Sequence, residues 1–219
     1  GAVANTGVVI GANLTTTGNG SEIDFESAVT LTGDADEVIT LATNGAADSD
    51  IILRSTLGNT ANAESITFNA GALGDVTVTG AVGDLGTGDI VITDAFDATF
   101  SSTVDAENFT QTDGQGTTLF SGTIDLANNF TFSGNNLTIN GAANTIDGDF
   151  DANLNTAAGA LTFGNAATTT VGGFLTQDII GAVANTGVVI GANLTTTGNG
   201  SEIDFESAVT LTGDADEVI

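Results

Sequence analysis

The first 39 residues of the chain return, letter for letter, as its last 39 residues. Gly1–Ile39 and Gly181–Ile219 have the same sequence, so the chain holds one full period of 180 residues and the beginning of the next. Exact repetition at a long period is typical of architectures in which each unit packs only against its neighbours along the chain. We therefore expect a window from a longer tandem array. One repeat would occupy residues 1–180, and the start of the next, continuous with the first, residues 181–219.

The long period contains shorter units of similar shape. Residues 100–104 (FSSTV) and 120–124 (FSGTI) align closely, and apolar and polar residues alternate nearby, which predicts strands with one buried face. Looser copies extend the series to a column of equivalent positions at Val29, Leu57, Val82, Val104, Ile124, Phe150, Val171, Ile190 and Val209. The mean spacing of roughly 22 residues predicts roughly eight short units per repeat.

Units of this size carry two or three short strands and cannot bury an apolar face alone, so they must stack coil on coil. We therefore expect an all-β fold, a parallel β-helix or β-solenoid with roughly eight coils per 180-residue repeat. At ~4.8 Å per coil, one repeat would advance ~38 Å along the axis. The interior is expected to hold Ile23, Phe25, Val29, Ile51, Leu53, Leu57, Val76, Val78, Val82, Phe100, Val104, Phe120 and Ile124.

Short strings of one texture recur along the whole chain, such as LTI at 137–139, ITF at 66–68 and GAVG at 80–83. This texture resembles the filamentous-haemagglutinin-like and autotransporter-passenger-like β-solenoids of bacterial surface proteins. The resemblance implies a right-handed parallel β-helix, export from the cell, and an extracellular or cell-surface location. No catalytic motif accompanies it, so it assigns no functional residue.

Composition narrows the function. The chain has 28 acidic residues against a single base, Arg54, and it lacks His, Cys and Tyr. Because only carboxylates and hydroxyls remain as acids, bases or nucleophiles, we expect that the chain is not an enzyme. The acidity argues against nucleic acid and anionic membrane surfaces as partners, since phosphate contacts need basic side chains. No apolar run is long enough to span a bilayer.

Two groups of carboxylates stand out as candidate sites. Asp147, Asp149 and Asp151 alternate along one stretch, and clusters of oxygen ligands suit Ca²⁺. The EF-hand pattern fails there, because Ala152 stands where Gly is required and Ala158 where Glu is. A second group crowds a turn at Asp34, Asp36 and Glu37. The alternative is an acidic, solvated coat that keeps a long fibre soluble, and we expect no cofactor other than calcium.

Polar residues of other kinds also recur. An Asn precedes a Phe-Thr or Leu-Thr pair at Asn13, Asn108, Asn129, Asn136 and Asn193. Each is a glycosylation sequon, but recurrence at one point of the unit favours a ladder of stacked amides. The Thr runs at 15–17 and 168–170 are explained by β-propensity, because coil lengths of 19 to 28 residues would break the register of a flat, ice-binding array. Arg54 is expected above Glu26, in a surface ion pair.

These observations together predict a structural repeat of a secreted, acidic, filament-forming protein. It would serve as a spacer, sheath or fibre of a cell surface or extracellular matrix. Its partners would be further copies of its own repeat stacked end to end, and other fibres bundled at its side, with no nucleic acid and no membrane insertion. One alternative is the stalk of a bacterial adhesin whose binding tip lies outside these residues. The other is a polysaccharide- or calcium-binding module.

Overall fold

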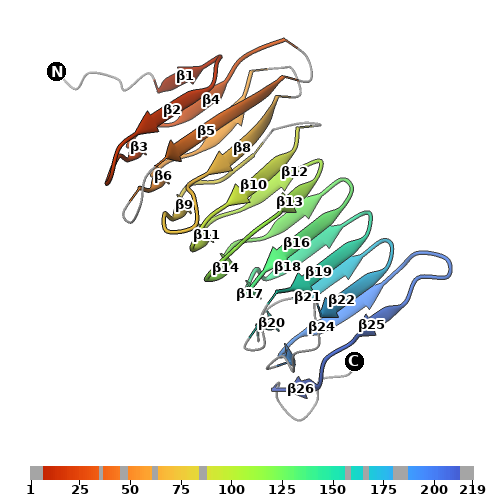
Figure 1. The fold of residues 1–219 in the computed structure, drawn as a ribbon. Coiled ribbons are helices and arrows are strands. Elements are labelled where there is room, and N and C mark those ends of the chain that lie inside the picture. The colour runs from red at the N-terminus through yellow and green to blue at the C-terminus, as the bar shows by residue number, and fades with distance from the viewer. Residues whose placement is uncertain are drawn as a thin grey trace.

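The chain winds into a stack of coils. The computed structural model describes residues 7–34, 37–44, 49–60, 64–83, 88–155, 159–164, 168–179 and 187–212. These residues form 26 short strands, with no helix among them. Strands pair in parallel with the strands of the coils before and after, so the sheets run along the axis of the stack (Figure 1). The fold is therefore a parallel β-solenoid, which confirms the fold class predicted from the sequence.

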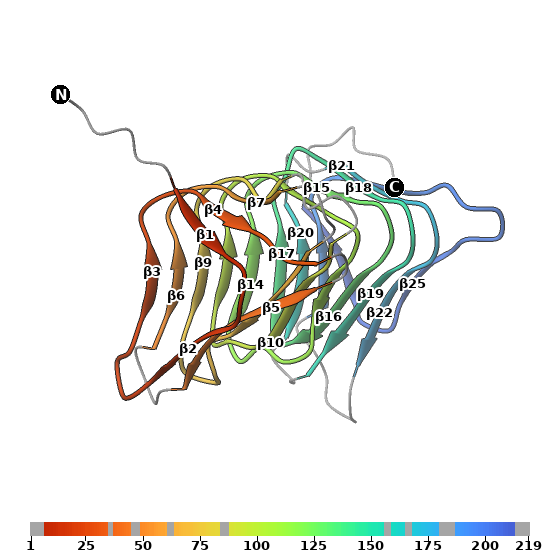
Figure 2. The same cartoon turned by 90° about the horizontal axis from the view of Figure 1, so that it is seen from above.

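Each coil has three sides, which we name faces A, B and C in the order in which the chain visits them (Figure 2). Face A contains β1 (Val8–Ile10), β4 (Val29–Leu31), β7 (Leu57–Asn59), β12 (Val104–Ala106), β15 (Ile124–Leu126), β18 (Ala143–Ile146), β21 (Thr168–Val171) and β24 (Asn193–Thr196). Between β7 and β12 this face narrows to one residue, Val82, which bridges Leu57 in the coil before and Val104 in the coil after.

Faces B and C are continuous nine-stranded sheets. Face B contains β2 (Leu14–Thr17), β5 (Val38–Asn44), β8 (Ser65–Asn69), β10 (Ile90–Asp94), β13 (Phe109–Gln111), β16 (Phe130–Gly134), β19 (Phe150–Leu154), β22 (Leu175–Ile179) and β25 (Ile203–Phe205). Face C contains β3 (Ile23–Phe25), β6 (Ile51–Leu53), β9 (Val76–Val78), β11 (Ala98–Phe100), β14 (Thr117–Phe120), β17 (Asn136–Ile139), β20 (Ala160–Phe163), β23 (Gly187–Ile190) and β26 (Val209–Leu211).

The core is a continuous apolar column enclosed by the three faces. Side chains alternate between inside and outside along each strand, as the pleat requires, and most of the inward ones are Val, Ile, Leu, Phe and Ala. A few inward side chains are polar. All interior residues predicted from the sequence are buried there, with Phe25 partly buried near the first coil. Each fully buried aliphatic or aromatic side chain stabilises the fold by about 1.5–3 kcal/mol relative to exposure.

Phenylalanine rings stack along the middle of this core. Phe100 lies over Phe120 on face C, with ring centroids 5.0 Å apart and planes 6° from parallel, which confirms the predicted stack. A second column on face B stacks Phe109, Phe130 and Phe150 at 4.9 and 4.8 Å. The two columns meet edge to face, as in the Phe109–Phe120 contact at 5.0 Å and 81°. Both geometries are the favourable ones for aromatic pairs, and they lock successive coils together.

Coils of different length keep one register. Phe25, Leu53, Val78 and Phe100 stand directly above one another on face C, although 28, 25 and 22 residues separate them. Variable coil length therefore does not break the alignment of side chains, contrary to the expectation from the sequence.

Threonine columns illustrate the same point. On face C, Thr77 lies beside Thr99, and on face A, Thr145, Thr170 and Thr195 follow one another in three successive coils. Uneven coils thus do not exclude aligned threonines, contrary to the expectation from the sequence. Pairs of threonine side chains across neighbouring strands stabilise a sheet, so β-propensity accounts for these columns without a ligand.

The predicted column that begins at Val29 is correct as far as Ile124 and wrong beyond it. Its next members are Asn144, Thr169 and Leu194. The residues that were predicted there lie elsewhere: Phe150 on face B, Ile190 and Val209 on face C, and Val171 two positions further along face A.

The cause of this error is a pair of buried polar residues. The Asn144 amide donates to the Thr169 hydroxyl at 3.2 Å and accepts the Ile124 N–H at 3.0 Å. Because Asn144 and Thr169 are hydrogen-bonded to each other inside the core, both can be buried at positions where other coils have apolar residues. The column predicted from the sequence contains only apolar residues, so it included neither Asn144 nor Thr169.

The two copies of the repeated segment lie on different faces. β1 is on face A, whereas β23, which consists of the same residues 180 positions later, is on face C. β2 and β24 likewise lie on faces B and A, and β3 and β25 on faces C and B. The second copy is therefore turned back by one face relative to the first. Residues 180–186 lie outside the described residues, so the domain division at residue 180 stays a prediction.

Candidate functional site

Asp149, one of the predicted calcium ligands, belongs to a hydrogen-bonded ladder along the corner between faces A and B. Its Oδ1 accepts the backbone N–H of Phe174 at 2.9 Å, and its own N–H donates to Asn129 Oδ1 at 2.8 Å. The Asn129 N–H donates to Asn108 Oδ1 at 3.0 Å, and the Asn108 amide donates to Asp89 Oδ1 at 2.8 Å. Asn108 and Asn129 thus belong to a mixed Asn and Asp ladder, in which the side-chain oxygen of each Asn accepts a backbone N–H of the next coil. This differs from the predicted ladder, in which the amide side chains were expected to stack on one another.

The other two predicted ligands lie at either side of Asp149. Asp147 is exposed at the corner that follows β18, and Asp151 lies on the outer side of β19. Asp151 Oδ1 accepts the Thr176 hydroxyl at 3.2 Å and the Asn153 amide at 3.3 Å. In the part of the chain that the structure describes, no three His, Cys, Asp or Glu side chains are grouped so as to hold a metal ion. Calcium binding by Asp147, Asp149 and Asp151 stays a prediction.

The second acidic group is described only in part, because Asp36 lies outside the described residues. The Asp34 N–H donates to Glu37 Oε2 at 3.2 Å, which is a local turn contact. A buried carboxylate that the sequence did not single out, Glu64, lies in the next coil and accepts the Gly33 N–H through Oε1 at 2.9 Å. These contacts place carboxylates against backbone donors at the corner.

A ladder made entirely of aspartates follows the corner between faces B and C. Asp50 Oδ1 accepts the Asp75 N–H at 2.9 Å, and Asp75 Oδ1 accepts the Asp97 N–H at 3.1 Å. Asp97 Oδ1 then accepts the Thr117 N–H at 2.6 Å. Hydrogen bonds to charged acceptors stabilise by about 1.5–3 kcal/mol each, so the ladder fastens coil to coil outside the core. The signal in the sequence is an Asp directly before each strand of three successive coils, and it was missed.

The remaining Asn-x-Thr sites are at several corners. Asn13 Oδ1 accepts the Thr40 N–H at 2.8 Å between faces A and B, and Asn136 Oδ1 accepts the Ala160 N–H at 3.2 Å between faces B and C. Asn193 begins β24, after the corner between faces C and A. The expectation that all five occupy one point of the unit is therefore wrong. Their shared property is a position at the start of a strand, where an amide side chain can accept an N–H from the next coil.

Arg54, the single base, binds Asp24 and not Glu26. Its Nε donates to Asp24 Oδ1 at 2.9 Å and its Nη2 donates to Asp24 Oδ2 at 2.8 Å. This fork lowers the pKa of Asp24 and raises that of Arg54. Leu53 pairs with Phe25 as expected, which places Arg54 next to Glu26 in the coil before. The long Arg54 side chain nevertheless extends back along the strand to Asp24. The predicted surface ion pair exists with a different partner.

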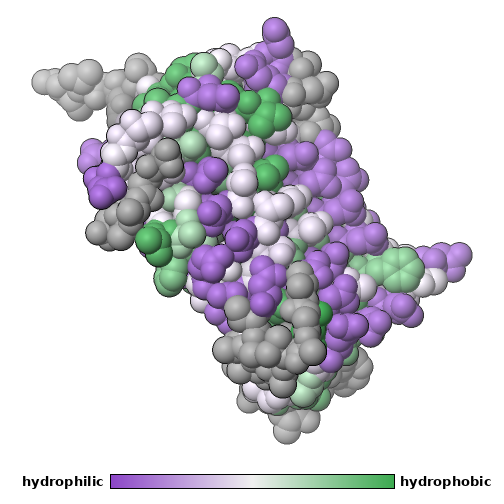
Figure 3. All heavy atoms as spheres, in the orientation of Figure 1, coloured by the Kyte–Doolittle hydropathy of each residue, from purple (hydrophilic) through white to green (hydrophobic). Residues whose placement is uncertain are grey.

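Two other carboxyl groups have shifted pKa values. Partial desolvation raises the pKa of Asp178, and the charges of Asp151, Glu206 and Asp204 raise it further. Burial raises the pKa of Asp94, with a smaller contribution from Asp113. Both cases are explained by desolvation and like-charge repulsion on an acidic surface. Figure 3 shows that hydrophilic residues cover much of the visible surface, with hydrophobic ones scattered between them.

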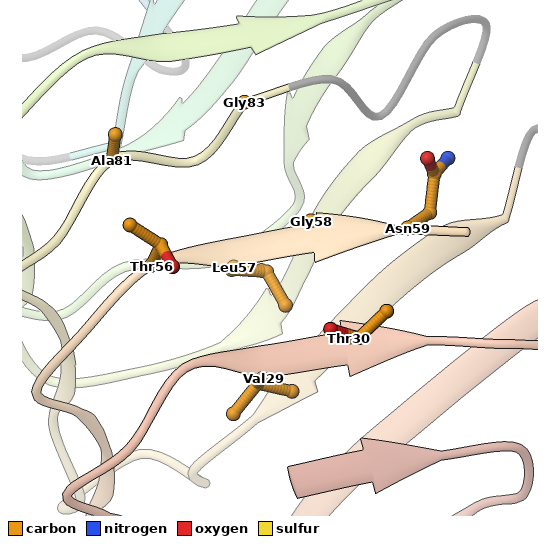
Figure 4. Close-up of a pocket in the computed structure, with 8 residues that line it drawn as sticks. All are labelled: Val29, Thr30, Thr56, Leu57, Gly58, Asn59, Ala81 and Gly83. Atoms are coloured by element: carbon orange, nitrogen blue, oxygen red, sulfur yellow. The ribbon is translucent and has the colours of Figure 1, made fainter. Parts of the chain in front are cut away.

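A hollow of about 280 Å³ lies where face A narrows (Figure 4). It is lined by Val29, Thr30, Thr56, Leu57, Gly58, Asn59, Ala81 and Gly83. Gly58 and Gly83 continue the outward row that begins at Thr30, and the absence of their side chains leaves the space. No ionisable side chain lines the hollow, so it offers no group for proton transfer.

The fold and these surfaces define a class of protein: a parallel β-solenoid with repeating coils and acidic, hydrogen-bonded corners. No family model, no curated protein and no solved structure matches the chain. Among the described residues, none forms a helix that is long and apolar enough to cross a membrane.

Proposed function

We propose that the chain is a structural repeat of a secreted, acidic, filament-forming protein of a cell surface or extracellular matrix, where it acts as a spacer, sheath or fibre. One observation carries the proposal: strands of the second copy extend the sheets of the first repeat. β23 pairs with β20, β24 with β21 and β25 with β22, all in parallel. A segment that repeats in sequence and adds to an open sheet edge can continue without limit.

Three further features support the proposed secreted filament. The core column and the corner ladders both run along the axis, so the coils are joined inside and outside. The net charge of -27 favours solubility and keeps neighbouring fibres apart at low salt. The texture that resembles filamentous-haemagglutinin-like and autotransporter-passenger-like proteins favours export and a cell-surface location.

The length of the particle tests this function. Proteins with two, four and eight repeats should form unbranched rods in electron micrographs. Because β23, the copy of β1, comes one strand before eight coils are complete, each repeat should lengthen the rod by ~37 Å at ~4.8 Å per coil, slightly less than the ~38 Å of eight full coils. Oriented samples should diffract at ~4.8 Å along the long axis of the rod. Beads joined by flexible linkers, or particles whose length does not follow the repeat number, would refute the filament. The adhesin-stalk alternative shares the rod and differs in its tip.

Calorimetry tests the binding-module alternative. We expect weak, unsaturated heats with Ca²⁺ and Mg²⁺ that about 150 mM NaCl suppresses, because screening weakens an acidic coat in general. A specific site would instead give saturable, stoichiometric binding that Asp149→Asn abolishes and Asp125→Asn, on the outer side of face A, leaves unchanged. That second outcome would favour a calcium-binding module. Saturable binding of a polysaccharide by the isolated repeat would favour the other form of this alternative.

A further inference from the structure

The repeat does not complete a whole number of turns. Along face A, the positions that follow β1 are β4, β7, Val82, β12, β15, β18, β21 and β24, so β24 lies eight coils after β1. β23, the copy of β1, is one strand before β24. One period of 180 residues therefore makes eight turns less one face, or seven and two-thirds turns.

Within each copy the folding is the same. Val8 pairs with Val29 and Ile10 with Leu31 in the first copy. The second copy repeats these pairings, between Val188 and Val209 and between Ile190 and Leu211. The segment thus keeps its internal register and is moved as a unit to the neighbouring face.

The second copy, in its rotated position, is well packed against β20 of the first repeat. Val188 lies over Leu161, and Ile190 over Phe163, and all four side chains are buried. Without the rotation, Val188 would lie on face A above Thr169, a polar residue. Val188 and Ile190 therefore bury apolar area against apolar area on face C, which stabilises the observed seating.

We propose that the edge formed by β20, β21 and β22 is the docking surface for the first coil of the following copy of this repeat. Each copy that docks there is rotated about the axis by one face relative to the copy before it. The proposal rests on the filament function proposed above. Since all junctions between identical repeats have the same sequence, successive repeats are each turned by one face in the same sense. The original face returns after three repeats, an axial distance of ~110 Å at ~4.8 Å per coil.

This rotation distributes the surface of the repeat around the fibre. The aspartate ladder Asp50–Asp75–Asp97 and the exposed Leu73 and Phe96 lie at the corner between faces B and C. In the next repeat the same residues lie between faces A and B, and in the third between faces C and A. A fibre or other partner that approaches from any side thus meets every feature of the repeat.

Cysteine pairs distinguish the two seatings, and the native chain has no cysteine to interfere. The variant Thr162→Cys/Val189→Cys places both thiols on the outer side of face C, where the two residues are opposite each other. The variant Thr170→Cys/Val189→Cys joins the residues that would be opposite without rotation. Thr138→Cys/Thr162→Cys is the matched positive control, since these residues are opposite each other within the first repeat.

With a short bifunctional thiol reagent, we expect the first pair to react within a few-fold of the control rate. The Thr170→Cys/Val189→Cys pair should react at least about tenfold more slowly. The reverse order would overturn the rotation and leave the filament intact. If neither pair reacts while the control does, the docking surface itself is wrong, and the proposed filament falls with it.

Discussion

The first and second copies of the repeated segment have one sequence and two environments. Leu31 is 0% exposed in the first copy, because β7 covers β4, whereas its counterpart Leu211 in β26 is 59% exposed. The order is reversed earlier in the segment. Leu14 in β2 is 38% exposed, and Leu194, which rests on β21, is 6% exposed. Both exposed leucines lie at an end of the described stack, because β2 is the first strand of face B and β26 is the last strand of face C. Their exposure therefore reflects the lack of a described coil on one side and is not a property of the leucine or of its strand.

The pairing at the start of the segment, in contrast, is the same in both copies. Gly7 and Gly187 have positive φ angles of 79° and 112°, which favour glycine. The residue that follows each glycine donates its N–H to the same partner, Val8 to Ala28 at 2.7 Å and Val188 to Ala208 at 2.9 Å. The pairing of this strand with the strand one coil later is therefore the same in both copies, although the pair lies on face A in the first copy and on face C in the second.

Electrostatic environments also differ between the copies. Asp24 binds Arg54 in the next coil, and its pKa is lowered. Its counterpart Asp204 lies on face B near Asp178, and its charge helps to raise the pKa of that carboxyl group. The same residue is thus a partner of a cation in one copy and a neighbour of an anion in the other.

The largest expected effect separates Leu31 from Leu211. Leu31→Ala should destabilise the coils around it by about 2–5 kcal/mol, because it leaves a cavity in the core. In the 219-residue chain, where β26 is the last described strand of face C, Leu211→Ala should cost no more than about 0.5 kcal/mol, as at other exposed positions. Hydrogen exchange of the amides in β7 and β23 measures the two effects locally. Equal losses at the two sites would show that the second copy is covered as the first is.

The second pair of leucines, Leu14 and Leu194, should show a smaller difference in stability, and here the substitution in the second copy costs more. Leu194→Ala should cost about 2–3 kcal/mol and Leu14→Ala about 1 kcal/mol or less, following the difference in buried area. Urea unfolding of the two variants, monitored with hydrogen exchange near β5 and β21, makes the comparison. A larger loss at Leu14 would contradict the seating of β24 on β21.

A third test addresses the acidic cluster at Asp178. Its raised pKa means that the folded chain binds this proton more tightly, so stability falls as pH rises from the unfolded value of about 3.9 through the folded pKa. Asp178→Asn should therefore match the native chain at about pH 3 and exceed it by a few tenths of a kcal/mol at pH 7. Urea unfolding at both pH values measures this. Asp125→Asn controls for the general loss of one charge, and an equal gain there would remove the local explanation.

The smallest effect concerns the ion pair of the first copy. Arg54→Gln should raise the pKa of Asp24 towards its ordinary range, because the guanidinium that holds it down is lost. Carboxyl titration by NMR, with Asp204 as the matched residue of the second copy, follows the change. An unchanged Asp24 titration would mean that the pair is not formed in solution.

Much of the fold was predictable, and the errors share one cause. Alternating apolar residues identified the strands, and the repeated FSSTV and FSGTI strings placed Phe100 over Phe120. The column failed at Asn144 and Thr169, because a buried polar pair has no signature in an apolar pattern. The predicted partner of Arg54 was wrong for a related reason. The carboxylate that this long side chain binds depends on how the coils stack, which the sequence alone does not give.

The candidate site was less predictable than the core. The sequence drew attention to Asp147, Asp149 and Asp151 because they are close in the chain. The ladder at Asp50, Asp75 and Asp97 is instead formed by residues that are one coil apart. Contacts along a solenoid axis join residues about one coil apart in sequence, so their register has to be known before such a ladder can be recognised.

The class of fold, most of the inward side chains and the pairing of similar strands one coil apart could be predicted from the amino-acid sequence alone. These follow from the period of two along each strand and from local turn geometry. Only the tertiary structure decided on which face a strand lies, because that depends on how many strands precede it in the stack. It also decided which of two identical aspartates meets a cation, since that depends on the coils directly before and after.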